Sequence, residues 1–269
     1  MANAEATTYE NITVEGGAAV GRLTLNRPDI GNALTPEMMG EVARAMETLA
    51  NDEAVRAVVI DANGRQFSTG GDLGFLDDMT GYDPFEIKST VYGYFGAGVR
   101  AIRLCPKPTV AAVQGSAAGA GCEIALACDF RIAATDVSFL ESWIHLGLIS
   151  PLGGMSLLPQ LVGLSKANEM LLLGEAVGAE EAARIGLVNK VVEPDQLAGE
   201  AAALAERLAA GAPLGLRAMK EGIRRGLEQP LAQEWEHNVY VQAMLIDSED
   251  FAEGVAAMKE RRRPSFKGK

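Results

Sequence analysis

Two glycine-rich stretches, residues 67–73 and 113–123, contain the residues best suited to chemistry. Because glycine has no side chain, each stretch can bring backbone N–H groups close to a ligand. The second stretch also ends in a carboxylate, that of Glu123. Fixed N–H groups that converge on one place stabilise the negative charge that develops on an oxygen atom during a reaction. We therefore predict that the two stretches form two halves of one oxyanion site.

The elements around these stretches should place them at the same edge of a sheet. Residues 57–60 and 108–113 are short, continuous apolar runs typical of strands covered on both faces, and each leads into one glycine-rich stretch. In such sheets the ligand crevice lies at the carboxyl ends of the strands. Residues 123–128 have helical composition, so we expect the second stretch to lead into a helix N-terminus, whose free N–H groups and dipole favour negative charge.

The remaining pattern predicts a front half that alternates strands and helices and a rear half that is mainly helical. Thr35 and Pro36 predict a helix start, and Ser165 and Ala179 predict two more. Further strands are expected at residues 12–14, 20–25, 130–133 and 188–192, and further helical segments at residues 195–210, 214–227 and 231–259.

Composition excludes several classes of protein. Apolar residues make up 48% of the 269 residues and charged residues 22%, which is typical of a globular protein and not of a disordered one. The formal net charge of −12 repels polyphosphate, so we expect no nucleic-acid partner. No apolar run reaches the roughly 18 residues of a membrane span, and the first ten residues do not resemble a signal peptide. We expect a cytoplasmic protein without a membrane partner.

The residue types and their spacing predict no bound metal and no redox cofactor. The two histidines, His145 and His237, have no ligand partners at metal-binding spacing. The three cysteines lack the spacing of a metal site or a disulfide framework, and we expect them to be reduced. Dinucleotide, phosphate-loop and nucleophile-elbow motifs are incomplete or missing from the sequence.

Taken together, the motifs resemble those of the enoyl-CoA hydratase/isomerase (crotonase) superfamily. The matching segments, which span nearly the whole chain, are residues 26–28, 32–34, 67–73, 114–115, 119–123, 147–149 and 182–189. The resemblance implies an α/β fold: a spiral of ββα units over residues 1–200 and a C-terminal helical trimerisation region over residues 201–269. It implies a homotrimer or a homohexamer built as a dimer of trimers. It also implies an acyl-CoA substrate, with coenzyme A as part of the thioester and no separate cofactor.

The resemblance assigns roles to three catalytic positions. Gly71 and Ala120 correspond to the backbone donors of the family's oxyanion hole, and Glu123 corresponds to a general acid/base. This assignment agrees with the chemistry, since a thioester that gains or loses a proton at its α-carbon passes through an enolate. Two plainer interpretations remain open. The glycines could serve only tight turns, and Glu123 could be a helix-terminal charge without chemistry.

The sequence departs from the family at the second catalytic carboxylate. Hydratases of the family carry a glutamate four residues after the position of Phe139, and here that position is Trp143. Glu141 lies two residues earlier, and on an extended segment it would share a face with residue 143, so it is a candidate replacement. It could equally be a surface or salt-bridged glutamate. Pro151 stands where some isomerases and dehalogenases of the family have an aspartate. Trp143 could shape an acyl pocket or pack in the core.

The resemblance also implies a set of residues for coenzyme A, whose backbone would receive the adenine end and the pantetheine arm. They are Arg27, Ala33, Leu34, Ser68, Gly70, Asp72 and Leu73. The basic residues between Arg261 and Lys269 could meet the nucleotide phosphates or form a solvated run. Residues 79–94 could form a mobile wall over the substrate or an ordinary surface helix.

The function that these expectations support best is enoyl-CoA hydration, the addition of water to a trans-2-enoyl-CoA. Two alternatives stay open. A single carboxylate can move a proton between two carbons of a bound enolate, which favours an enoyl-CoA isomerase or another enolate-forming enzyme. The tryptophan at the second glutamate position favours a relative that binds acyl-CoA without hydratase activity.

Overall fold

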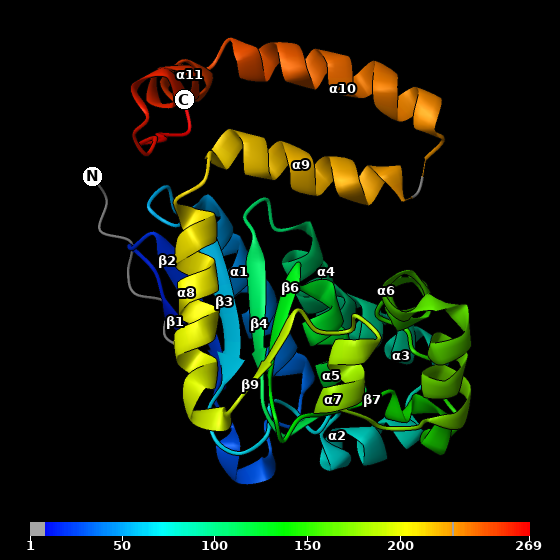
Figure 1. Cartoon of the computed structure of the whole chain (residues 1–269). Coiled ribbons are helices and arrows are strands. Elements are labelled where there is room, and N and C mark those ends of the chain that lie inside the picture. The colour runs from blue at the N-terminus through cyan, green and yellow to red at the C-terminus, as the bar shows by residue number, and fades with distance from the viewer. Residues whose placement is uncertain (1–8, 228) are drawn as a thin grey trace.

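A six-stranded sheet lies at the centre of the computed structural model, which describes residues 9–227 and 229–269 (Figure 1). The strand order is β1-β2-β3-β4-β6-β9. β1 pairs antiparallel with β2, and these are the two strands expected at residues 12–14 and 20–25; every other pair in this sheet is parallel. The strands are β1 (Ile12–Glu15), β2 (Val20–Leu25), β3 (Ala57–Ala62), β4 (Thr109–Val113), β6 (Phe130–Ala134) and β9 (Lys190–Val192).

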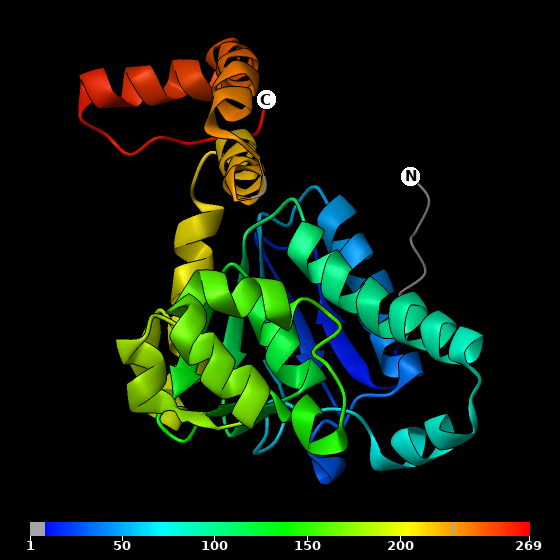
Figure 2. The same ribbon diagram turned by 90° about the vertical axis from the view of Figure 1, so that its right-hand side faces the viewer.

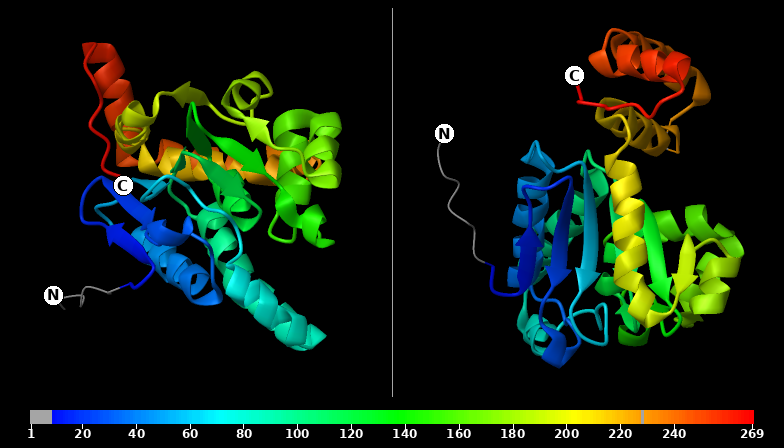
Figure 3. Two further views of the ribbon diagram at one scale, coloured as in Figure 1. Left: turned by 90° about the horizontal axis from the view of Figure 1, so that it is seen from below. Right: turned by 60° about the vertical axis from the view of Figure 1, so that its left-hand side comes forward.

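Helices cover both faces of this sheet, as the continuous apolar runs predicted. Val58 and Ile60 of β3 pack toward α1 (Pro36–Asn51) and α4 (Gly96–Leu104). The alternate residues, Ala57 and Val59, pack toward α8 (Leu197–Ala209) on the other face, because side chains alternate along a strand. Figure 3 shows α8 lying along one face of the sheet with α1 behind it. α1 begins where predicted, since the Thr35 side chain accepts a hydrogen bond from Met38 N.

A second, three-stranded sheet brings the two glycine-rich stretches together. It contains β5 (Ser116–Ala118), β7 (Ser138–Leu140) and β8 (Val177–Gly178). Two isolated parallel bridges extend this contact, one between Ser68 and Ala117 and one between Leu34 and Gly71. The loop after β3 therefore lies against the segment after β4, at the carboxyl ends of the parallel strands.

The residues after the first glycine-rich stretch form a helical arm. Asp72 caps α2 (Leu73–Asp78), and Asp83 and Glu86 form a reciprocal capping box at the start of α3 (Pro84–Thr90). α3 continues through a π-helical turn, η3 (Val91–Phe95), into α4, and Figure 2 shows this run as one long helix. The short 3-10 helix η2 (Met79–Gly81) joins α2 to α3.

α5 (Ala120–Ala127) follows the second glycine-rich stretch as predicted, and a helical rear follows β7. The rear comprises α6 (Gly154–Asn168), η5 (Glu169–Leu173) and α7 (Ala179–Arg184), with 3-10 helices η1 (Pro28–Ile30), η4 (Ser142–Leu146) and η6 (Pro194–Gln196) elsewhere. α6 is kinked at Gly163, where φ is 77°, so a new helical segment starts beside the predicted start at Ser165.

The last three helices stand beyond the end of the sheet (Figures 1 and 2). They are α9 (Pro213–Gly226), α10 (Leu231–Ile246) and α11 (Glu249–Glu260). The helical segment expected at residues 231–259 is broken, because α10 ends at Ile246 and Ser248 caps the next helix by accepting from Phe251 N. The predicted division at residue 200 falls within α8, which packs against the sheet. In the described ranges, every helix is too short or too polar to cross a membrane.

Candidate active site

Close backbone packing brings Gly71 and Ala120 to the same cavity. Gly70 has φ 92°, and a Cβ atom there would lie 2.9 Å from the carbonyl oxygen of Ala118. A Cβ atom on Gly121 would lie 2.6 Å from Cβ of Ser68. Both positions therefore require glycine, and this requirement explains why the two stretches are glycine-rich.

Both candidate oxyanion donors are free to meet a ligand. Ala120 is the first residue of α5, so its N–H is one of the groups that the helix leaves unpaired. The residues flanking Gly71 are paired, because Leu34 N donates to Gly70 O and Asp72 N donates to Leu34 O. Within the described residues, the N–H of Gly71 and that of Ala120 donate to no other group. The dipole of α5 adds positive potential at Ala120.

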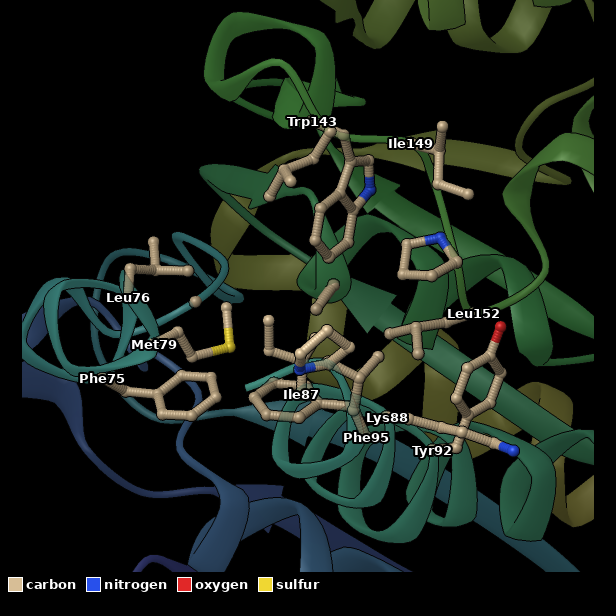
Figure 4. A pocket seen from close by; sticks show the side chains of 16 residues that line it. Phe75, Leu76, Met79, Ile87, Lys88, Tyr92, Phe95, Trp143, Ile149 and Leu152 are labelled. Atoms are coloured by element: carbon tan, nitrogen blue, oxygen red, sulfur yellow. The ribbon is translucent and has the colours of Figure 1, made fainter. Parts of the chain in front are cut away.

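The cavity that these two residues line has a volume of about 370 Å³ and almost wholly apolar walls. Figure 4 shows Trp143 and Ile149 on one side, Phe75, Leu76 and Met79 on another, and the helical arm with Ile87, Tyr92 and Phe95 below. The rings of Phe75 and Phe95 stack with centroids 5.5 Å apart. Residues 79–94, for which a wall over the substrate and an ordinary surface helix were both open, supply much of the helical side of this cavity.

Glu123 lies in the first turn of α5 and is 1% exposed. Its Oε1 atom accepts hydrogen bonds from Ser150 Oγ at 2.7 Å, from Gly154 N at 2.6 Å and from Leu152 N at 3.2 Å. Its Oε2 atom has no partner. Burial raises the pKa of the Glu123 carboxyl above its ordinary value, and the hydrogen bonds, first that of Ser150, oppose the rise.

Glu141, also 1% exposed, lies beside Glu123. A Cβ atom on Gly154 would lie 2.9 Å from Oε1 of Glu123 and 3.1 Å from Oε1 of Glu141, so both carboxyl groups flank one glycine. Neither oxygen of Glu141 has a hydrogen-bond partner. Burial, and then the negative charge of Glu123, raise the pKa of Glu141 from 4.5 to about 8. Because the two carboxyl groups are close together and buried, the protonation state of one affects that of the other.

Trp143 stands between the cavity and this carboxyl pair. Its side chain lines the cavity and lies 3.7 Å from the place of a Cβ atom on Gly119. Its Nε1 is buried without a partner. The indole and the thiol of Cys122 lie near enough to Glu141 to oppose the rise in its pKa, although neither makes a well-formed hydrogen bond to it.

The carboxyl groups themselves do not reach the cavity wall in this conformation. The lining includes Trp143, Pro151 and Leu152 but neither glutamate. Leu152 connects the two regions, because it lines the cavity while its N–H donates to Glu123. Gly147 and Gly153, with φ of 69° and 132°, lie on either side of residues 148–152, which include Pro151 and Leu152.

The residues implied for coenzyme A surround the start of α2. Arg27 Nη1 donates to Ala33 O at 2.6 Å and pairs with Asp72 at 3.3 Å. Leu73, at the other side of Asp72, is exposed. Leu34, Ser68 and Gly70 are buried, and Ser68 Oγ donates to Asn32 O and accepts from Gly70 N. The side chain of Ser68 is therefore occupied within the protein.

The basic C-terminal residues and two of the three cysteines, Cys105 and Cys128, are not among the residues that line the cavity. Arg262 forms ion pairs with Glu253 and Glu260 beside α11. All three cysteines are buried and free. In the part of the chain that the structure describes, no group of three or more histidine, cysteine, aspartate or glutamate side chains could hold a metal ion.

The sequence analysis missed Ser150, Leu152 and Gly154, the three donors to Glu123. Gly153 and Gly154 gave a local signal for a tight backbone approach. Ser150 gave none, because its hydrogen bond joins residues 27 positions apart, and only the tertiary fold brings them together.

Comparisons with known proteins agree with this architecture. A model of the family described as enoyl-CoA hydratase/isomerase matches residues 15–269. The crotonyl-CoA hydratase of Syntrophomonas wolfei subsp. wolfei is 34% identical over 260 residues, which are 96% of this chain and 98% of that protein. The trans-2-decenoyl-[acyl-carrier-protein] isomerase of Streptococcus mutans serotype c is 33% identical over 97% of this chain and 99% of that protein.

The structural comparison gives the same result. The crystal structure of a putative enoyl-CoA hydratase from Streptomyces coelicolor A3(2) superposes with a TM-score of 0.94 at 37% identity, covering all of this chain and 98% of that one. The predicted fold, including the C-terminal helical region, is thereby confirmed. This chain belongs to the enoyl-CoA hydratase/isomerase family, within the crotonase superfamily.

Proposed function

We propose that the protein is an enoyl-CoA hydratase that adds water across the double bond of a trans-2-enoyl-CoA. One observation carries this proposal: two unpaired backbone N–H groups, on Gly71 and Ala120, border an apolar cavity with a buried pair of carboxyl groups behind its wall. Hydration requires this combination, since it needs stabilisation of an enolate and two proton-transfer steps.

The thioester carbonyl oxygen would accept hydrogen bonds from Gly71 N–H and Ala120 N–H. As water attacks, electron density moves from the double bond to this oxygen, and both donors gain strength because they were fixed beforehand. Each such donor is worth about 3 kcal/mol in oxyanion holes of known enzymes. Because both donors belong to the backbone, a small side chain at position 120 leaves them intact.

The two carboxyl groups would divide the proton transfers. Glu123, through its unpartnered Oε2, takes one proton from water, and the remaining hydroxide forms a bond to C3 of the substrate. Glu141 gives its proton to C2, and the enolate returns to a thioester. The substrate gains one water molecule, and a proton then passes from Glu123 to Glu141 to restore the starting state.

Substrate binding must open the wall for this reaction to occur. Trp143 and Leu152 separate the cavity from the carboxyl pair. Gly147 lies between these two residues and Gly153 follows Leu152, and both glycines have conformations that favour glycine. We infer that the bound thioester displaces these side chains and brings C2 and C3 to the carboxyl groups. Catalytic contacts commonly tighten only in the substrate complex.

The cavity favours an apolar acyl group. Its volume of about 370 Å³ and its aromatic walls suit a medium-length or aromatic chain. The coenzyme A moiety would extend from this cavity past Gly70, Asp72 and Leu73 to Arg27, Ala33, Leu34 and Ser68. Backbone groups of this segment would receive the pantetheine arm, since the side chains of Leu34 and Ser68 are buried.

We also propose that the protein assembles in the cytoplasm as a homotrimer or a dimer of trimers. Large apolar side chains on α10, including Trp235, Val239, Tyr240 and Met244, are more than half exposed in the single chain. An exposed apolar surface of this extent is typical of a face that another protein covers. The free, buried cysteines agree with a reducing compartment.

Isomerisation is the second candidate function. Only one of the four carboxyl oxygens, Glu123 Oε1, is held by donors, and the pair can hold one proton that moves between two carbons of an enolate. The relative from Streptococcus mutans is named for isomerisation of an acyl-carrier-protein thioester. This reaction needs no water in the cavity, which agrees with its apolar lining.

Two spectrophotometric assays test the proposal. The protein should consume the conjugated thioester absorbance of a trans-2-enoyl-CoA, and Glu123→Gln should lower kcat by at least about 100-fold while ligand affinity stays within about tenfold. Glu47→Gln, an exposed residue of α1, is the matched control. Gain of the absorbance from a 3-enoyl-CoA would identify an isomerase. Binding of a thioester without either reaction would identify a non-catalytic relative.

A further inference from the structure

Glu123 and Glu141 are equally buried but unequally stabilised. Each is 1% exposed, and both flank Gly154. Oε1 of Glu123 accepts from Ser150 Oγ and from two backbone N–H groups. Glu141 accepts none. Hydrogen bonds from donors favour the charged form of a carboxyl group, so the environment distinguishes two otherwise identical side chains.

The pair must also share protons. Two carboxylates this close and this deeply buried cannot both be ionised at neutral pH without a large electrostatic cost. The titratable group beside them is the thiol of Cys122, and burial raises its pKa, so it stays neutral and supplies no counter-charge. One proton therefore remains on the pair, and it resides on the carboxyl group with fewer donors.

We propose that Ser150 is a positioning residue that assigns the roles of base and acid, by holding the negative charge on Glu123 and leaving the proton on Glu141. Ser150 is 3% exposed and its hydroxyl lies 2.7 Å from Oε1. Its donor is the only one of the three that a substitution removes, because Leu152 and Gly154 donate through the backbone. The assignment of base and acid rests on the proposed hydration.

The hydroxyl also selects the reacting atom. With Oε1 engaged by three donors, Oε2 is the oxygen of Glu123 that remains free to take a proton. Loss of the Ser150 hydroxyl would weaken the hold on the charge. The shared proton would then spend more time on Glu123, which disables the base and the acid together.

A direct titration tests this inference without relying on activity. Glutamate side chains carrying carbon-13 at the carboxyl position would be followed by NMR across pH in the full-length protein, and Glu123→Gln and Glu141→Gln would assign the two buried signals. In Ser150→Ala, we expect the apparent pKa of Glu123 to rise by about one pH unit, the effect of one lost hydrogen bond to a charged group. Ser150→Cys, a weaker donor, should give an intermediate shift.

The matched control is Ser156→Ala, which removes an exposed hydroxyl from α6 on the same segment of chain. It should leave both titrations unchanged. Ser150→Cys keeps the size of the side chain, so it serves as the measurement if Ser150→Ala fails to fold. An unchanged pKa of Glu123 in whichever variant folds overturns the role of Ser150.

Kinetics then separate positioning from general structural damage. In Ser150→Ala, the acid limb of the kcat/KM profile for a trans-2-enoyl-CoA should shift to higher pH by the same one unit. On that limb kcat/KM should be about tenfold lower than in the wild type, and the difference should disappear at higher pH. An equal loss at every pH contradicts the proposal. If the pKa of Glu123 shifts but the protein has no hydratase activity, the effect of Ser150 on Glu123 is supported and the proposed reaction is wrong.

Discussion

Glu141 is a buried carboxyl group without a hydrogen-bond partner, and such a group is costly to ionise. In an unfolded chain it would titrate near 4.5, whereas burial and the charge of Glu123 raise its folded pKa to about 8. Between these values the folded protein binds a proton that the unfolded chain has released. The contribution of Glu141 to stability is therefore full below pH 4.5 and is lost progressively as the pH rises to about 8.

The corresponding prediction concerns Glu141→Gln. Glutamine cannot ionise, so the variant should resist unfolding more than the wild type at pH 8, whereas the two should differ little at pH 4.5. The wild type should lose up to about 1.4 kcal/mol per pH unit across the window relative to the variant. Urea unfolding at several pH values measures this difference. A gap that does not change with pH would show that Glu141 titrates normally.

The proposed catalytic residues differ in how far the sequence could identify them. Gly71, Ala120 and Glu123 stand in local motifs, so their order along the chain is enough to select them. Glu123 and Glu141 are close to each other only because α5, the segment after β7 and Gly154 come together in the tertiary fold. No local sequence pattern indicates this contact. The alternation of an extended segment made Glu141 a candidate but left its surroundings open.

At the scale of elements, the contact between α5 and the first glycine-rich stretch determines the geometry of the proposed oxyanion site. Gly121 is buried, and a Cβ atom there would meet Cβ, Oγ and the carbonyl oxygen of Ser68 at 2.6, 2.8 and 2.9 Å. Ser68 cannot move easily, because its hydroxyl donates a hydrogen bond to Asn32 O and its backbone is hydrogen-bonded to Ser116 and Ala118. The N-terminus of α5 would have to move instead.

We therefore expect Gly121→Ala to destabilise the protein by about 1–3 kcal/mol, as overpacking generally does. It should also lower kcat more than it weakens binding, because it displaces the N–H of Ala120. Gly199→Ala is the control, since a Cβ atom there meets nothing within 4 Å and alanine favours α8. Chemical unfolding and steady-state kinetics measure both effects. Equal stability and activity in the two variants would refute the close contact.

Most elements could be predicted from sequence because their signals are local. Thr35 and Pro36 marked a helix start, and the apolar runs marked β3 and β4. The break between α10 and α11 was missed, since Ser248 is an ordinary polar residue until its side chain caps a helix. The path of the helical arm, which forms the cavity wall, depends on packing against α1 and could not be inferred.

At the scale of the whole molecule, α10 should bury its apolar face against another copy of the chain. The double substitution Trp235→Glu with Val239→Glu would place two charges on that face, so we expect the assembly to fall to monomers. Ala203→Glu, at an exposed position of α8, adds a charge outside α10 and is the control. Light scattering with size-exclusion chromatography gives the mass. An unchanged mass in the double variant would show that α10 does not hold the copies together.

The chain passes from the core to the C-terminal helices through the short connection between Ala209 and Pro213. No residue of α10 or α11 lines the cavity, and the oxyanion donors and carboxyl pair all precede this connection. The last helices still contact the core, because Lys220 of α9 pairs with Asp129 and Arg56 donates to Phe266 O. A chimaera joined at this connection would keep every residue of the proposed site from one parent, and it would have to preserve these two contacts to keep the C-terminal helices in place.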